Sequence, residues 1–391
     1  MARNKLGEFS VASEPSVAPM KLRRKVLLAA ASLVVSVLLA ELGLRMFFTN
    51  PFRGTRPDHV VRLLYNHGGL DQDIERRRID AEVQLVRFRV HSRGYIEPAF
   101  RFGDPDLTVV FFGGSTTECV AVQERLRFPA LVSRNLEKDG LKVNTLNVAR
   151  ARNTAHDSIN VLFNHVIVDS PDVAVMMHAT NDAGVLNQGS GYRRRMGSRG
   201  SVSKGVKYAL QVLSARSSLF GLVRNAVSVP RHRHAPSARE GGRPIPPNVE
   251  PFRARLRIFV GMCRALGITP VLMTQPLVPG LANELTPTWT DPRAQNALNV
   301  VIREVGGEKG ALVIDLAARV AKENSENLEK MFYDSMHVSD YGSEIYARII
   351  SEQLRDLLIS LRSSYAASSG TSLPDSAAPA DRNISGRVVP L

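Results

Sequence analysis

Cysteine is scarce in this chain, with only Cys119 and Cys263 among 391 residues. Two cysteines are too few for a disulfide framework, and they show none of the spacings typical of a metal site. The two interpretations that remain are a single pair and two buried free thiols. No internal repeat is apparent, so a repeat architecture is not expected.

Acidic residues are outnumbered, with 37 Asp and Glu against 51 Lys and Arg and a formal net charge of +14. Much of the excess lies in residues 187–249, where twelve Lys or Arg accompany a single acid, Glu240. Within this stretch, residues 206–227 space their apolar side chains as a helix does. A cationic amphipathic helix can lie on anionic lipid headgroups, or it can pack on its own domain with its basic face in solvent. Both interpretations stay open.

Long apolar runs are also rare, and the one that occurs lies near the N-terminus. Residues 26–40 carry no charge, and after Glu41 the run continues to Leu44. These 19 residues form roughly 28 Å of helix, which is enough to span hydrocarbon. Four basic residues precede the run: Lys21, Arg23, Arg24 and Lys25.

A cleaved signal peptide and an uncleaved anchor are the two interpretations of this run. No small-x-small cleavage site is evident after it, which favours the anchor. The basic cluster keeps residues 1–25 in the cytoplasm, with 26–44 as the transmembrane segment. We therefore expect a single-pass protein of the inner membrane with its remaining residues in the periplasm. This location makes a nucleic-acid partner unexpected, although the charge alone would permit one.

From residue 107 onward, short apolar runs alternate with helix-length amphipathic segments, as in a three-layer α/β/α fold with a five-stranded, mostly parallel sheet. The expected strands cover residues 107–112, 143–148, 173–178, 270–274 and 311–315. The expected helices cover residues 124–139, 157–168, 252–266, 292–305 and 340–361. The main domain is thus assigned to 106–362, after a lead-in over 45–105. The insertion at 187–249 exceeds a normal loop, and residues 363–391 read as a disordered tail.

Polar residues follow the first and third expected strands and precede the last helix. Gly113-Gly114-Ser115 ends the first strand, and such a turn lifts a serine hydroxyl to a helix N-terminus. Asn181 follows the third strand, and Asp334 stands three residues before His337. Ligands of parallel sheets bind beyond the carboxyl ends of the strands, where these residues converge. The order Ser, Asp, His occurs in many hydrolases built on such sheets, whereas Ser115 alone would be read as a helix N-cap.

Together these blocks resemble the SGNH hydrolases, also called the GDSL esterase/lipase superfamily, whose fold is flavodoxin-like. Gly113-Gly114-Ser115 matches the first block, Asn181 the third, and Asp334 with His337 the last. The resemblance covers about 90–362. It implies that Ser115 is the nucleophile, His337 the general base and Asp334 the group that orients the imidazole. It also implies an oxyanion hole made by the backbone N–H groups of Ser115 and Arg152 and the side-chain amide of Asn181, with no cofactor and no metal.

The second block departs from the family pattern Asn-x-Gly-x-x-Gly. Asn147 is present, but Ala149 and Arg152 stand where the two glycines are usual. A backbone N–H survives at Arg152, while glycine's backbone freedom and small size are lost. Arg152 either obstructs the pocket or brings a cation to its rim for an anionic substrate.

Three functions remain open from the sequence. The first is hydrolysis of O-acyl esters, acetyl esters above all, on an extracytoplasmic glycan or lipid. The second is O-acyl transfer to an exported polysaccharide by the same residues. The third is an envelope binding protein in which the altered second block has abolished turnover. The oligomeric state is not indicated by the sequence.

Overall fold

A computed structural model gives the structure of the chain. It describes residues 22–48, 71–77, 83–187, 191–192, 202–224, 246, 248–278, 292–323 and 325–368. The chain divides into two compact units: Met1–Pro57 with Gly200–Arg233, and Asp58–Arg199 with His234–Leu391.

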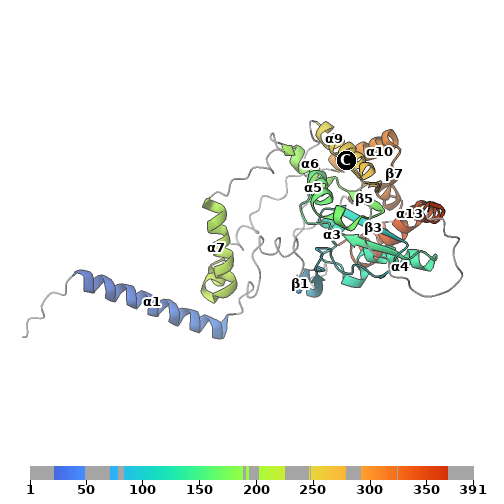
Figure 1. Cartoon of the computed structure of the whole chain (residues 1–391). Coiled ribbons are helices and arrows are strands. Elements are labelled where there is room, and N and C mark those ends of the chain that lie inside the picture. Colours follow the sequence, from blue (N-terminus) through green and yellow to red (C-terminus); the bar gives the residue numbers. More distant parts are fainter. Residues whose placement is uncertain are drawn as a thin grey trace, which may run out of the picture. The chain divides into compact units, whose positions relative to one another are not determined.

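Five parallel strands form the central sheet of the larger unit, in the order β4-β3-β5-β6-β7 (Figure 1). Each begins and ends within one or two residues of the strand expected from the sequence, so the predicted α/β fold is confirmed. Parallel sheets are covered on both faces, which explains why these strands are near-continuous apolar runs. The strands are β3 (Leu107–Gly113), β4 (Val143–Asn147), β5 (Val173–Met177), β6 (Thr269–Met273) and β7 (Leu312–Ile314).

Helices cover both faces of this sheet and complete the three layers. Because successive side chains of a strand point to opposite faces, Val110 and Phe112 of β3 join one apolar core while Val109 and Phe111 join the other. The first core includes residues of α5 (Ala155–Asn164), α6 (Thr180–Leu186), α9 (Glu250–Ala265) and α10 (Pro292–Lys309). The second includes residues of α4 (Phe128–Lys138), α11 (Leu316–Val320), α12 (Ser325–Met331) and α13 (Asp340–Ser368).

Short elements complete the larger unit. A four-residue helix, α3 (Ser115–Glu118), follows β3 directly. Two 3-10 turns are η1 (Glu124–Leu126) and η2 (Val166–Asp169). The last helix, α13, runs seven residues past the predicted end at Leu361, and residues 369–391 lie outside the described part of the chain.

Part of the predicted lead-in belongs to the folded unit. Strands β1 (Asp71–Arg77) and β2 (Val83–Arg89) form an antiparallel pair. The side chain of Arg127, 1% exposed, donates to the carbonyls of Arg87 (2.9 Å), Glu97 and Cys119 (3.3 Å). Arg127 therefore joins the lead-in to Cys119, the residue that follows α3.

Both cysteines are buried free thiols in this unit. Burial raises the pKa of Cys119 and of Cys263 to about 12. At neutral pH they are protonated, so Cys119 offers no thiolate close to Ser115.

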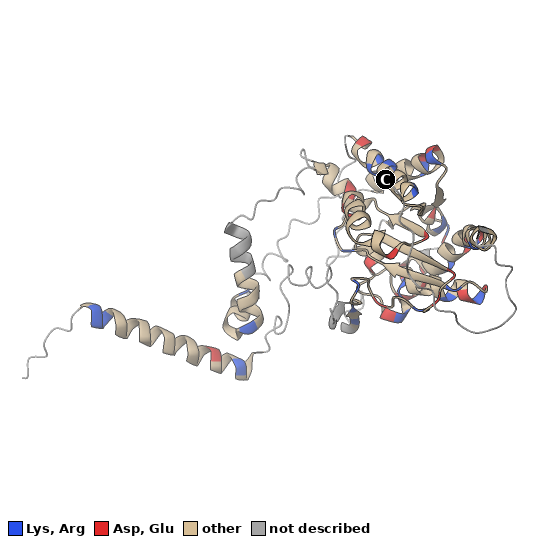
Figure 2. Cartoon of the chain, in the orientation of Figure 1, with Lys and Arg blue, Asp and Glu red and all other residues tan. Residues whose placement is uncertain are grey.

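The smaller unit contains α1 (Leu22–Phe47) and α7 (Val202–Arg216), and residues 218–224 are also helical. Among the described residues, α1 is the one helix long and apolar enough to cross a membrane. Its charged residues lie only toward its two ends (Figure 2). The predicted segment 26–44 thus lies inside a longer helix, whose length and composition also suit a signal sequence.

Glu41 joins α1 to the insertion. Its carboxylate accepts hydrogen bonds from Ser217 Oγ (2.7 Å), the Ser218 N–H (2.9 Å) and the Leu219 N–H (3.0 Å). Arg45 donates to Glu41 (2.8 Å) and to the carbonyl of Arg216 (3.3 Å). The end of α1 is therefore fastened to residues 216–219.

Candidate active site

Ser115 lies at the first position of α3, where β3 ends. Two glycines make this turn possible. A Cβ at Gly113 would lie 2.0 Å from Thr117 Oγ1, and one at Gly114 would lie 2.6 Å from Asn181 Nδ2. The turn is therefore closed to larger residues, and it brings Asn181 directly over the residue before the serine.

His337 and Asp334 complete a Ser-His-Asp arrangement with Ser115. The distance from His337 Nε2 to Ser115 Oγ is 2.8 Å, and that from His337 Nδ1 to Asp334 Oδ2 is 2.7 Å. The structure thus brings together three side chains that are up to 222 residues apart in the sequence. Both distances are within hydrogen-bond range for a nucleophile and its base.

Hydrogen bonds hold Asp334 ionised. Burial alone would raise its pKa, but the contacts from the His337 side chain and from the backbone N–H groups of Met336 (2.8 Å) and His337 (2.7 Å) outweigh it. The pKa of Asp334 therefore lies below its ordinary value. An ionised Asp334 favours the tautomer of His337 that carries its proton on Nδ1 and leaves Nε2 free to accept the serine proton.

The loop after β4 carries Arg152 and contacts both Asn181 and the strand before Ser115. The N–H of Arg150 donates to the carbonyl of Gly113 (3.2 Å), and Asn181 Nδ2 donates to the carbonyl of Asn153 (2.9 Å). Arg152 lies between these two tethers with φ of 68°, in the left-handed region. This angle explains why the family usually has glycine at the position. The three groups expected in the oxyanion hole therefore belong to segments in mutual contact.

Gln275, after β6, joins the first and third blocks. Its Nε2 donates to Thr116 Oγ1 (3.1 Å), and its Oε1 accepts from the Thr180 N–H (3.0 Å). The side chain is 5% exposed. Gln275 fixes the distance between the residue after Ser115 and the residue before Asn181, a role that only long-range contacts reveal.

Tyr333 packs against the imidazole of His337. The two rings are stacked, with 5.6 Å between centroids and 9° between planes. The Tyr333 N–H also donates to the His337 carbonyl (3.1 Å). The tyrosine limits how far the imidazole can turn away from Ser115, and no sequence motif marks it.

Asp182, next to Asn181, has a structural role. Its carboxylate accepts from the Ala155 N–H (3.0 Å) and from the hydroxyl of Tyr192 (2.5 Å). The first contact joins α6 to the start of α5, directly after the loop with Arg152. Asp182 therefore helps to fix the loop and Asn181 with respect to each other.

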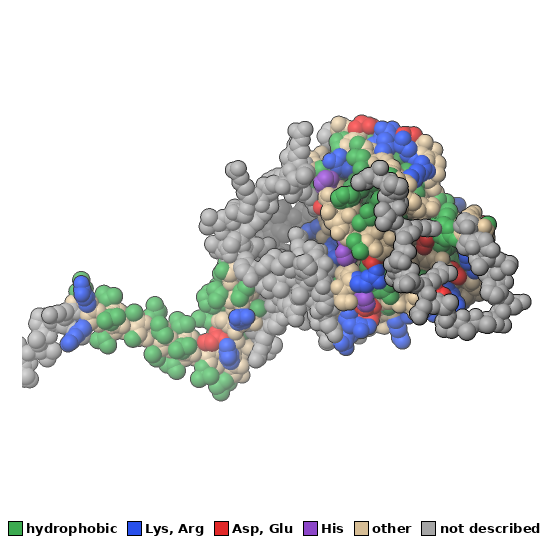
Figure 3. All heavy atoms as spheres, viewed as in Figure 1, with side chains coloured by type: hydrophobic (Ala, Val, Ile, Leu, Met, Phe, Trp, Pro, Cys, Tyr) green, Lys and Arg blue, Asp and Glu red, His purple; other side chains and the backbone are tan. Residues whose placement is uncertain are grey.

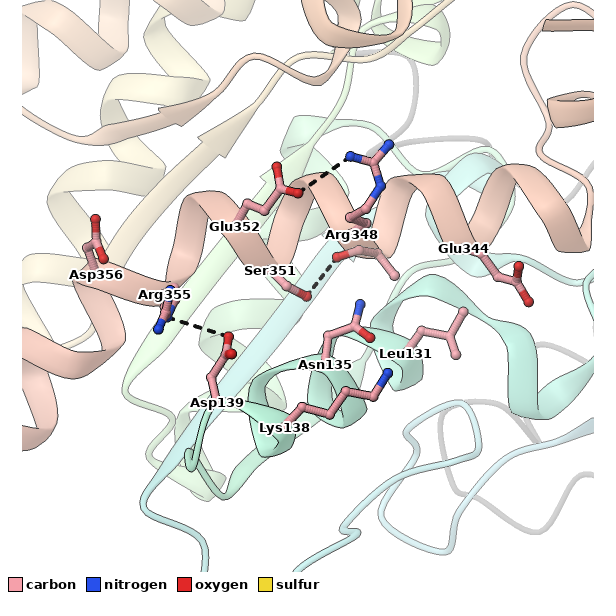
Figure 4. Close-up of a pocket in the computed structure, with 11 residues that line it drawn as sticks. Leu131, Asn135, Lys138, Asp139, Glu344, Arg348, Ser351, Glu352, Arg355 and Asp356 are labelled. Carbon is pink, nitrogen blue, oxygen red and sulfur yellow. Dashed lines mark hydrogen bonds and ion pairs between the residues drawn. The ribbon is translucent and has the colours of Figure 1, made fainter. Parts of the chain in front are cut away.

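A surface hollow between α4 and α13 is separate from this arrangement (Figure 4). Four of its charged side chains form two pairs, Arg355–Asp139 (3.5 Å) and Arg348–Glu352 (3.4 Å). None of Ser115, Asn181, Asp334 and His337 lines it. In the described part of the chain, no group of three or more His, Cys, Asp or Glu residues is placed to hold a metal ion.

The sequence profile of the GDSL-like lipase/acylhydrolase family matches residues 111–345, a range that contains Ser115, Asn181, Asp334 and His337. The chain belongs to this family. The resemblance found in the sequence is thereby confirmed, and this GDSL-like protein is a carboxylic ester hydrolase.

Several solved structures are similar to this GDSL-like protein. A lipase/acylhydrolase from Enterococcus faecalis is 18% identical, over 64% of this chain and 96% of its own, with a TM-score of 0.41. An acetylxylan esterase from Geobacillus stearothermophilus is 19% identical, over 63% of this chain and 94% of its own, with a TM-score of 0.40. A lipolytic protein of the G-D-S-L family from Desulfitobacterium hafniense is 14% identical, over 63% of this chain and 99% of its own, with a TM-score of 0.40. No curated protein matches the chain.

Proposed function

We propose that this protein is a serine esterase that removes O-acyl groups, acetyl above all, from a glycan or lipid outside the cytoplasm. The observation that carries the proposal is the unbroken hydrogen-bonded series from Ser115 Oγ through His337 to the ionised Asp334. In this arrangement a weak nucleophile is activated by an oriented base.

Acylation begins when Ser115 Oγ attacks the ester carbonyl and its proton passes to His337 Nε2. Asp334 stabilises the imidazolium that forms. The tetrahedral intermediate then collapses, the bond to the alcohol oxygen breaks, and the alcohol leaves with the proton from Nε2. The acyl group remains on Ser115.

The oxyanion accepts hydrogen bonds from Asn181 and from two backbone N–H groups, those of Ser115 and Arg152. The Asn181 amide has two hydrogens, and its contact with the Asn153 carbonyl uses one of them. The second remains for the substrate. One such donor contributes about 2.7–4 kcal/mol to lowering the barrier.

Deacylation repeats these steps with a second nucleophile. Water gives up a proton to His337, attacks the acyl carbonyl, and releases the acid while the proton returns to Ser115. A sugar hydroxyl in place of water would make the same residues an acyltransferase. Offering glycan oligosaccharides together with an acyl donor separates the two, because transfer yields an acylated sugar and hydrolysis yields free acid.

The catalytic proposal is tested by Ser115→Ala and His337→Ala. Each is expected to lower turnover of p-nitrophenyl acetate on the order of 10⁶-fold, with thermal unfolding nearly unchanged. The wild-type protein is expected to react with a fluorophosphonate probe, and Ser115→Ala is not. Wild-type turnover in both variants, or a folded wild-type protein that the probe does not label, would contradict the assignment.

We also propose that α1 remains attached as a membrane anchor. The hydrogen bonds of Glu41 with Ser217, Ser218 and Leu219 support this, since they make the end of α1 part of a compact unit. We expect the membrane-extracted protein to keep residues 1–25 when its intact mass is measured. A mature N-terminus after residue 44 would contradict the anchor.

A further inference from the structure

We propose that α7 and the helix over residues 218–224 lie in the membrane interface, with their apolar side chains among the lipids, fastened to α1 through Glu41. This inference rests on the proposed retention of α1 in the membrane. It concerns the smaller unit alone.

Glu41 lies close to the end of the apolar run of α1. Leu44 closes the apolar run, and Glu41 precedes it by three residues, or about 5 Å of helix. A carboxylate at that depth is costly unless protein groups satisfy it. Besides Arg45 of α1 itself, which donates to Glu41 (2.8 Å), the groups that do so come from Ser217, Ser218 and Leu219, and the Glu41 side chain is left only 17% exposed. Since these partners must reach Glu41, residues 217–219 lie at the membrane surface.

Apolar side chains on both sides of this contact are exposed. They belong to the described end of α7 and to the helix that follows, where apolar atoms form much of the surface (Figure 3). Their exposed fractions are 49% for Leu210, 41% for Leu213, 38% for Phe220, 37% for Leu222 and 53% for Val223. Large apolar side chains that are exposed together on one short segment mark an interaction site.

Charge identifies the partner as a lipid surface. Residues 202–224 contain four basic residues and no acid: Lys204, Lys207, Arg216 and Arg224. An apolar face joined to basic residues is what binds a helix to anionic headgroups and the acyl chains beneath them. The contact with α1 places this face beside the bilayer that α1 spans, so the lipid is already within reach.

Tryptophan quenching in vesicles tests the inference on the full chain. The single tryptophan is first removed by Trp289→Phe, and the protein is placed in phosphatidylglycerol–phosphatidylethanolamine vesicles with brominated acyl chains. Leu213→Trp reports on the apolar face. Gln211→Trp is the matched control, two residues away and about 160° around the helix. Leu33→Trp, inside α1, reports on the anchor.

We expect brominated lipid to quench Leu213→Trp at least twofold more strongly than Gln211→Trp, and to quench Leu33→Trp fully. Equal quenching at 213 and 211, with iodide reaching both, would overturn the inference. So would a Leu213→Trp shielded from lipid and iodide alike, since a protein would then cover the face. If brominated lipid does not quench Leu33→Trp, the proposal that α1 is a membrane anchor is contradicted. Ester turnover is measured separately and tests only the proposed esterase function.

Two substitutions of Glu41 test whether this residue fastens α7 to α1. Glu41→Ala removes the acceptor, and we expect quenching of Leu213→Trp to fall to the level of the Gln211→Trp control while Leu33→Trp is unchanged. Glu41→Gln keeps one acceptor oxygen and should preserve most of the quenching. Unchanged quenching in Glu41→Ala would overturn the fastening role.

Discussion

Arg152 shows how one residue can depart from a family pattern and keep its backbone role. Its φ of 68° is an angle that glycine adopts freely and that costs other residues roughly 1–2 kcal/mol. The tethers on either side, at Arg150 and Asn153, hold the loop in this conformation. The N–H of Arg152 can therefore keep the place that a glycine N–H would have.

Replacing this arginine separates its backbone from its charge. We expect Arg152→Gly to raise the free energy of unfolding by up to about 1 kcal/mol, because the strain is relieved. Arg152→Ala keeps the strain and removes the charge, so it should give no such gain. Urea unfolding measures the difference in the free energy of unfolding between the two variants.

The same pair of variants decides whether the cation has been recruited. Turnover of a neutral ester should be kept or increased in Arg152→Gly if the side chain only obstructs the pocket. A decrease on neutral and anionic esters in both variants would show instead that the guanidinium takes part in binding.

Asp334 links stability to pH. Its native pKa is lowered, so the carboxylate stabilises the fold fully above its ordinary pKa of about 3.9. That contribution is lost as the pH falls through the lower native pKa. We expect Asp334→Asn to cost about 1.5–3 kcal/mol at pH 7, with a gap to wild type that narrows below about pH 4.

Urea unfolding at pH 7, 5 and 3 measures this gap. Asp104→Asn, at an exposed position in the loop before β3, is the control and should differ little from wild type throughout. A gap for Asp334→Asn that stays constant down to pH 3 would contradict the expectation.

At the scale of elements, the buried parallel strands were predictable and the edges of the fold were not. Strands such as β5 are short apolar runs bounded by polar residues, and periodicity locates them well. The strand β1, with the sequence Asp-Gln-Asp-Ile-Glu-Arg-Arg, is mostly charged and gives no such signal. Helix α13 extends past its apolar face because Ser363 and Ala366 allow helix to continue where nothing needs burying.

The parts of the candidate site that belong to short sequence motifs were predictable. Ser115, Asn181, Asp334 and His337 stand in short motifs beside strand ends or before a helix, and the sheet topology brings them together. The stacking of Tyr333 and the bridge made by Gln275 depend on side-chain contacts between distant segments. The backbone angle at Arg152 is likewise set by its tethers.

At the scale of the whole molecule, all five proposed site residues belong to the unit Asp58–Arg199 with His234–Leu391. We expect a protein that starts at residue 58, with 200–233 replaced by a Gly-Ser linker, to turn over p-nitrophenyl acetate like wild type without detergent. Removing 1–57 alone should leave Leu213 and Phe220 exposed and the protein prone to aggregate. Size-exclusion chromatography and turnover measurements compare the two shortened proteins. If the protein that lacks both 1–57 and 200–233 is soluble but inactive, the expectation is contradicted.

The buried guanidinium of Arg127 sets the minimal length of the enzyme. Two of its three carbonyl acceptors, those of Arg87 and Glu97, precede the first strand of the sheet. A protein trimmed to the family match at residue 111 would lack two of the three carbonyl acceptors of this guanidinium and the first four residues of β3. The smallest folding unit therefore begins well upstream of the region by which the family is recognised.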